Sequence, residues 1–196
     1  MKKLFLSLIA IALLSFYACK ESTNSESTMA EESVEIEEAV EAPDYDLFNS
    51  RTETMRAFFK AHENEDIEAI RNLLADTLKV SPPNYNGNQM VGKDEFIASL
   101  QNYHDNFENI NFTEGITLGD IQEGGWWSGS VYPKESASVS ADAIRIYGTW
   151  KATHSESGKE IGIKFYSIAW MNNDGKLAQY SSYFDVNGIA AQLAEE

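Results

Sequence analysis

The sequence of 196 residues has a single cysteine, Cys19, which directly follows an N-terminal apolar run. The rest of the chain therefore contains no thiol, and this excludes disulfide bonds, thiolate metal sites and thiol catalysis from its folded part. Histidine is scarce as well, and His62, His104 and His154 show no spacing typical of a metal site. We expect neither a metal nor another cofactor.

Basic residues are few. The chain has 15 Lys and Arg against 31 Asp and Glu, for a formal net charge of −16. Such an acidic surface repels phosphate backbones, so nucleic acid is not an expected partner. The chain also shows no Ser-His-Asp order, phosphate-cradling glycine loop, dinucleotide fingerprint or internal repeat.

The N-terminus has the three-part order of a secretory signal peptide. Met1–Lys3 is basic, Leu4–Leu14 is apolar but too short to span a bilayer, and Ala18-Cys19 follows at the usual processing distance. We predict a signal peptide over residues 1–18. The alternative is that Cys19 is discarded together with the peptide.

The small residue before Cys19 resembles the lipobox of bacterial lipoproteins, whose cysteine is diacylated and becomes the mature N-terminus. Phe16 and Tyr17 depart from the usual lipobox residues, and relaxed boxes of this kind resemble those of Bacteroidota. The resemblance implies a lipid anchor of the palmitate type at Cys19 and a location in the cell envelope. Lys20-Glu21 resembles an export signal to the outer membrane, and the alternative is a charge run that only solvates the chain. Both the periplasmic and the surface face of that membrane stay open.

Residues 19–45 are predicted to be the lipidated cysteine and a disordered acidic tether. From Lys20 to Asp46, ten acidic residues accompany one lysine, and large apolar side chains are too few for a core. Cleavage would remove Lys2 and Lys3, so 13 basic residues would face 31 acidic ones, a mature net charge of −18.

Residues 46–196 show the periodicities of one α+β domain. Apolar spacing predicts helices near residues 51–62, 65–74 and 93–107, with Asn49-Ser50 offered as the first cap. Alternation then predicts an antiparallel sheet that follows the helices. The predicted strands cover residues 76–80, 112–118, 138–144, 147–153, 160–171 and 176–185, with a tight turn at 172–175 and a short closing helix.

Three stretches, in this order, resemble the SnoaL-like branch of the nuclear transport factor 2-like (NTF2-like) superfamily. They are FFKAHENEDIEAIRNLLADTLKV, GNQMVGKDEFIASL and GKLAQYSSYFDVNGIAAQL. The counterparts of the family's buried-acid turn, Gly-x-x-x-x-Gly element and terminal Phe-Asp are Asp76, Gly87 to Gly92 and Phe184-Asp185. The resemblance implies a cone, in which a curved, mixed but mostly antiparallel sheet packs on three N-terminal helices, with a short C-terminal helix, around an apolar cavity. It leaves the activity open, because members include cyclases, isomerases and non-enzymatic domains.

The resemblance makes Asp185 a candidate general acid/base, because the family's cyclases have a cavity-facing aspartate at this position. A dry pocket raises the pKa of such a carboxylate toward neutrality. Tyr183, Tyr103 and His104 are candidate hydrogen-bond partners. The alternative is that Asp185 caps the C-terminal helix, a position that aspartate favours.

Aromatic and polar side chains are the candidates for ligand contact. Glycines flank the paired tryptophans at 126 and 127, a combination suited to gripping a ring or to covering an interface. Many family members have Glu and Trp at positions 179 and 181, and their replacement here weakens the case for cyclisation chemistry. The ligand-binding candidates are Trp126, Trp127, Tyr85, Tyr166, Trp170, Gln179 and Ser181.

Three functions follow. The favoured one is a cell-envelope lipoprotein whose cone binds a small, partly apolar ligand or a protein partner. The second is a metal-independent isomerase, cyclase or hydratase that uses Asp185. The third is a structural module in which the open sheet face, bearing Tyr166 and Trp170 or their opposite neighbours, meets a second copy of the chain.

Overall fold

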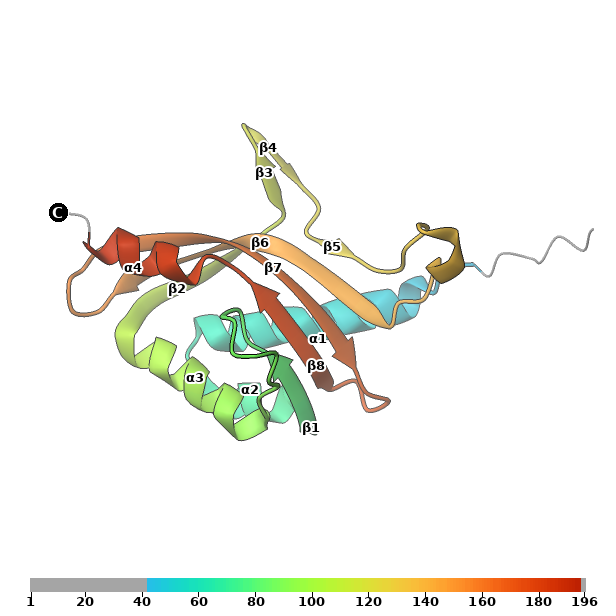
Figure 1. The fold of residues 1–196 in the computed structure, drawn as a ribbon, viewed down its shortest axis with the longest axis horizontal. Helices are drawn as coiled ribbons and strands as arrows, with labels where there is room; N and C mark the ends of the chain where they lie inside the picture. Colours follow the sequence, from blue (N-terminus) through green and yellow to red (C-terminus); the bar gives the residue numbers. More distant parts are fainter. Residues whose placement is uncertain (1–41, 195–196) are drawn as a thin grey trace, which may run out of the picture. The chain divides into compact units, whose positions relative to one another are not determined.

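The computed structural model describes residues 42–194, in which helices come first and most strands follow (Figure 1). The predicted signal peptide, Cys19 and nearly all of the predicted tether lie outside the described residues. Within the described part, no helix has both the length and the apolar character needed to cross a membrane. The helices are α1 (Tyr45–Glu63), α2 (Ile67–Leu73), α3 (Lys93–Asn106) and α4 (Val186–Ala194), with a short 3-10 helix, η1 (Lys134–Ser136).

The main sheet is mixed and six-stranded, in the order β1-β8-β7-β6-β2, with β5 also paired to β6. β1 and β8 are parallel, and the other pairs are antiparallel. The strands β3 and β4 form a separate hairpin that projects away from the sheet (Figure 1). The predicted α+β fold with a mostly antiparallel sheet is confirmed. The bounds are β1 (Leu74–Ser81), β2 (Phe107–Glu114), β3 (Ile116–Leu118), β4 (Ile121–Glu123), β5 (Trp126–Trp127), β6 (Ala143–His154), β7 (Glu160–Met171) and β8 (Leu177–Tyr183).

Aspartate side chains cap the first two helices. Asp44 and Asp66 each accept a hydrogen bond from the amide three residues further on, at 2.8 and 2.9 Å. The cap predicted at Asn49-Ser50 is therefore wrong, and α1 begins earlier than its apolar spacing suggested. A carboxylate at this position also interacts favourably with the helix dipole.

Leu74 and Phe107, which apolar spacing assigned to helices, instead begin strands β1 and β2. Both residues have an extended backbone, with φ −94° and ψ 136° at Leu74 and φ −136° and ψ 142° at Phe107. Each chain segment passes from helix to strand without a loop, and both side chains are buried. Because a buried apolar residue fits either period, spacing alone could not find these boundaries.

Other strand predictions also change. The strand predicted at 147–153 is part of the longer strand β6, which takes in only the end of the strand predicted at 138–144, and residues 138–142 lie outside any named strand. The strand predicted at 112–118 is divided at Gly115, whose φ of 104° is accessible mainly to glycine. A Cβ at this position would collide with the carbonyl oxygen of Glu123, so the hairpin closes here only because residue 115 has no side chain.

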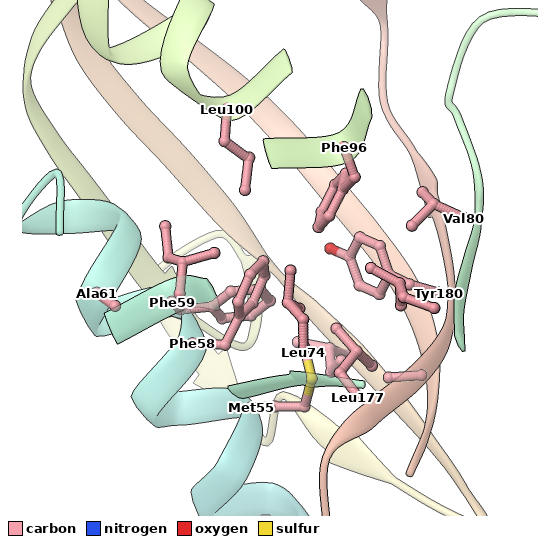
Figure 2. Close-up of a cluster of buried hydrophobic side chains, with 14 of the residues drawn as sticks. Met55, Phe58, Phe59, Ala61, Leu74, Val80, Phe96, Leu100, Leu177 and Tyr180 are labelled. Carbon is pink, nitrogen blue, oxygen red and sulfur yellow. The ribbon is translucent and has the colours of Figure 1, made fainter. Parts of the chain in front are cut away.

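The core lies between α1 and the inner face of the sheet. Met55 and Phe58 of α1 pack with Leu74 of β1 and Leu177 of β8, and all four side chains are at most 3% exposed (Figure 2). Burial of each such side chain contributes about 1.5–3 kcal/mol. This packing decides which face of the sheet turns inward.

Lys93 fixes the start of α3 against β1. Its Nζ donates to the carbonyl oxygen of Leu74 at 3.0 Å and to Oδ1 of Asp76 at 2.8 Å. The nearby ammonium group holds the pKa of Asp76 below its ordinary value. Asp76 is exposed, so the buried-acid turn expected from the family resemblance is wrong.

Candidate functional site

A cavity of about 460 Å³ lies between α1, α3 and the inner face of the sheet. The loop after β1 and the start of α4 complete its wall. Most lining residues are aromatic or aliphatic, and they include Phe58, Phe96, Leu100, Trp150, Phe165 and Phe184.

Strand β8 contributes alternate side chains to this wall, as a strand facing a core on one side must. Tyr180 and Ser182 of β8 line the cavity and are 5% and 7% exposed, and Phe184, directly after the strand, lines it as well. Figure 2 shows the Tyr180 side chain reaching inward toward Phe96 of α3, and burial raises the pKa of its phenol.

Five of the sequence candidates lie on the opposite, outer face of the sheet. The intervening positions of β8 place Tyr183 there, with Gln179 and Ser181, and β7 adds Tyr166 and Trp170. None of the five lines the cavity. The sequence could not decide this, because both faces of β7 and β8 carry aromatic residues.

Four rings form a row across this outer face, which we call the outer aromatic row: Trp127, Tyr147, Tyr166 and Tyr183. Their neighbouring centroids are 4.9, 4.7 and 5.7 Å apart, and the rings come from β5, β6, β7 and β8 in turn. Trp127 and Tyr183 are 40% and 58% exposed. Trp127 thus belongs to the outer face of the sheet rather than to the cavity.

Trp126 lies on the inner side but outside the cavity. Its Nε1 donates to Oε2 of Glu114 at 2.7 Å, and the guanidinium of Arg56 lies 5.1 Å from the ring centroid. Arg56 also pairs with Glu114 at 2.8 Å and holds the pKa of that carboxylate below its usual range. The structure therefore gives Trp126 a packing position.

Tyr85 lies in the loop between β1 and α3 and is 85% exposed. Its neighbours Asn84 and Asn86 line the cavity, but Tyr85 does not. This ligand-binding candidate therefore lies outside the cavity wall.

Asp185 is exposed and lies outside the cavity wall. Its Oδ1 accepts a hydrogen bond from the amide of Gly188 at 2.8 Å at the start of α4. A Cβ at residue 188 would lie 2.6 Å from Oδ2 of the same carboxylate, so this close cap needs glycine there. The placement is that of a helix cap, and among the described residues no aspartate lines the cavity.

His62 and His104 form a hydrogen-bonded pair at the cavity wall. The Nδ1 of His62 lies 2.8 Å from the Nε2 of His104, and the ring centroids of His62 and Trp150 lie 5.1 Å apart in a T-shaped arrangement. His62 lines the cavity, whereas His104 lies buried beside it and does not. Burial, reinforced by the charge of His104, lowers the pKa of His62 to about 3, and burial also lowers the pKa of His104.

Tyr103 is the one predicted catalytic candidate that lines the cavity, and burial raises the pKa of its phenol. Sequence reasoning did not select His62, Tyr180 or Ser182. The available signal for His62 was its position three residues after Phe59, on the same face of α1.

Charge is confined to the exposed part of the cavity lining. Among the described residues, Glu95 and Lys151 are the charged residues that line it, and both are solvent-exposed. Within residues 42–194, no group of three or more His, Cys, Asp or Glu side chains could hold a metal ion. The chemistry available inside the cavity is therefore apolar contact and neutral hydrogen bonding.

This arrangement of helices, sheet and cavity is the NTF2-like fold, which the family resemblance predicted. IdmH from Streptomyces antibioticus, a candidate polyketide cyclase, shares 13% identity, with a TM-score of 0.56 over 74% of this chain and 99% of its own. A candidate isomerase from Bacillus subtilis shares 14% identity, with a TM-score of 0.57 over 76% and 96%. An NTF2-like protein of unknown function from Burkholderia pseudomallei shares 16% identity, with a TM-score of 0.54 over 74% and 98%.

No protein-family model and no curated protein matches the sequence. At 10–16% identity, the likeness to solved structures establishes the fold of this chain. Its activity has to be argued from its own cavity.

Proposed function

We propose that this protein is a lipid-anchored protein of the cell envelope that binds a small, largely apolar molecule in its cavity. The observation that carries the proposal is the cavity itself, about 460 Å³ and lined mainly by aromatic and aliphatic side chains. This volume falls in the range of about 300–1,000 Å³ typical of small-molecule sites.

Binding accounts for the site better than catalysis by Asp185. An acid/base aspartate needs to face the substrate, but the Asp185 carboxylate is exposed and engaged with the Gly188 amide. Solved structures with this fold include an epoxide hydrolase/cyclase-like enzyme of pyran ring formation in the polyether salinomycin and a candidate isomerase. That likeness supports a small-molecule ligand without supplying the catalytic aspartate.

Two neighbouring serines of β8 allow a matched test. Ser182 lines the cavity, whereas Ser181 lies on the outer face of the same strand. The probe is N-phenyl-1-naphthylamine, a neutral dye whose fluorescence rises in apolar surroundings. We expect the wild type and Ser181→Phe to bind this dye and Ser182→Phe to bind it at least about tenfold more weakly, because the new ring occupies the cavity.

Circular dichroism is the control that checks whether both variants remain folded. Equal dye binding by the two folded variants, or no saturable binding by the wild type, would refute the cavity as the binding site. If Ser182→Phe does not fold, the replacement Ala152→Val, also in the cavity wall, provides a smaller obstruction with the same expected direction.

We also propose that the outer aromatic row mediates self-association. Four aligned rings on four adjacent strands, two of them at least 40% exposed, form a continuous apolar surface. Sedimentation of the described domain should show a concentration-dependent dimer that Tyr183→Ser weakens. Tyr85→Ser, which removes a still more exposed tyrosine elsewhere, should leave the dimer intact, and a monomer at all concentrations would exclude this function.

A further inference from the structure

The histidine pair makes one part of the cavity wall polar without making it charged. His62 lines the cavity from α1 and touches His104 of α3 through a 2.8 Å hydrogen bond. The charged lining residues, Glu95 and Lys151, are solvent-exposed. A ligand in the buried part of the cavity therefore meets the His62 imidazole but no fixed charge.

The buried end of the pair determines where its protons lie. Nδ1 of His104 is buried and has no hydrogen-bond partner in the part of the chain that the structure describes. Folded proteins leave a buried N–H without an acceptor more rarely than they leave an acceptor unpaired. We therefore assign the proton of His104 to Nε2, which then donates to Nδ1 of His62.

A neutral imidazole has one ring proton, so a His62 ring that accepts at Nδ1 has its proton on Nε2. Within residues 42–194 no side chain or carbonyl accepts from this Nε2–H, and Nε2 is not among the buried unpaired atoms. Because His62 lines the cavity, this N–H is available to a bound molecule.

We propose that the Nε2–H of His62, held by His104, is the donor that selects ligands with a neutral oxygen acceptor, such as a ketone carbonyl. The inference rests on the proposed function, since it presumes that an apolar molecule enters the cavity. A carboxylate placed at the same depth would lose its hydration without meeting a cation, which makes burial of an anion costly. The expected ligand is thus a neutral, mainly apolar molecule with a carbonyl-type oxygen.

Competition against the bound dye tests this selectivity. The competitors are 2-nonanone, nonane and nonanoate, and the measured quantity is the ratio of ketone affinity to alkane affinity. Replacement of His62 by Leu should reduce this ratio by about threefold to tenfold, which corresponds to one neutral hydrogen bond. His62→Gln retains an N–H donor and should preserve most of the ratio.

An unchanged ratio in His62→Leu would overturn the inference, as would tighter binding of nonanoate than of 2-nonanone by the wild type. Both outcomes would leave the proposed function standing if the dye still binds. Absence of dye binding by the wild type would instead refute the proposed function, so the two failures are distinguishable.

Nuclear magnetic resonance of the wild type tests the proton positions without any substitution. Long-range proton–nitrogen correlations should show the Nε2–H tautomer for both His62 and His104, and 2-nonanone but not nonane should shift the Nε2–H signal of His62. A His62 ring protonated on Nδ1, or an identical response to the two ligands, would overturn the assignment of this N–H as the selecting donor.

Discussion

The indole of Trp126 and the carboxylate of Glu114 are joined by a 2.7 Å hydrogen bond, and the guanidinium of Arg56 contacts both groups. Arg56 belongs to α1, and Glu114 ends β2. The tryptophan that the sequence suggested as a ligand contact therefore helps to join the first helix to the sheet.

Replacement of Glu114 by Ala should lower the free energy of unfolding by about 1–2 kcal/mol, because it removes charge-assisted hydrogen bonds at a half-exposed site. Glu53→Ala removes another partner of the same arginine, but Glu53 is 70% exposed, so a change of at most about 0.5 kcal/mol is expected. Urea unfolding measures both. Equal effects would mean that the Trp126 contact contributes nothing.

Acid should destabilise the domain through the histidine pair. Burial holds the pKa of His62 at about 3, below its unfolded value of about 6.5. The unfolded chain therefore binds a proton on this ring before the folded chain does, so the free energy of unfolding is highest above about pH 6.5 and falls as the pH falls. Between about pH 7 and pH 5 the loss from His62 amounts to about 2 kcal/mol. His104 is the ring directly hydrogen-bonded to His62, and Glu65 and Asp105 act on His104.

Urea unfolding at these two pH values provides the measurement. In His62→Gln the pH-dependent loss should shrink by about the same 2 kcal/mol. Identical pH dependence in the wild type and His62→Gln would contradict the prediction.

Asp185 should behave as a cap when it is replaced. Asp185→Ala is expected to lower the free energy of unfolding by about 1 kcal/mol, whereas Asp185→Asn, which keeps a capping oxygen, should change it by only a few tenths. Dye binding by the Asn variant should match the wild type. If the Asn variant is folded but no longer binds the dye, the result would contradict this prediction and indicate that Asp185 belongs to the ligand site.

The lipid anchor predicted from the sequence can be tested by mass. The mature protein isolated from the envelope should carry a diacylglycerol-type mass increase on Cys19 and partition into detergent. Cys19→Ala should lack the added mass and appear in the aqueous phase. Recovery of unmodified wild-type protein in the aqueous phase would exclude the anchor.

Short-range sequence patterns were sufficient to predict elements that are held by contacts between residues close in the sequence. Strand β7 has the predicted bounds, and the turn that follows it forms because Oδ1 of Asn172 accepts the amides of Asp174 and Lys176. Gly175 supplies the positive φ of 72°. These contacts lie within five residues of sequence, and turns of this kind can be predicted from their residue types.

The candidate site was harder to predict, because its geometry depends on distant segments. His62 and His104 are 42 residues apart, and no periodic pattern places the two rings in contact. The sequence likewise does not show which face of β8 turns inward, because this depends on the packing of α1 and α3 against it. Only the packing shows that Tyr180 and Ser182, rather than Gln179 and Ser181, border the cavity.

The parallel pairing of β1 with β8 joins residues that are far apart in the sequence, which bears on the rate of folding. Leu74 lies opposite Leu177, so this edge of the sheet joins segments from nearly opposite ends of the domain. Contacts between such distant residues form slowly, because a long loop must close first. An N-terminal portion of the domain cannot build the cavity wall by itself, which suits a chain whose predicted signal peptide would send it through a membrane before it folds.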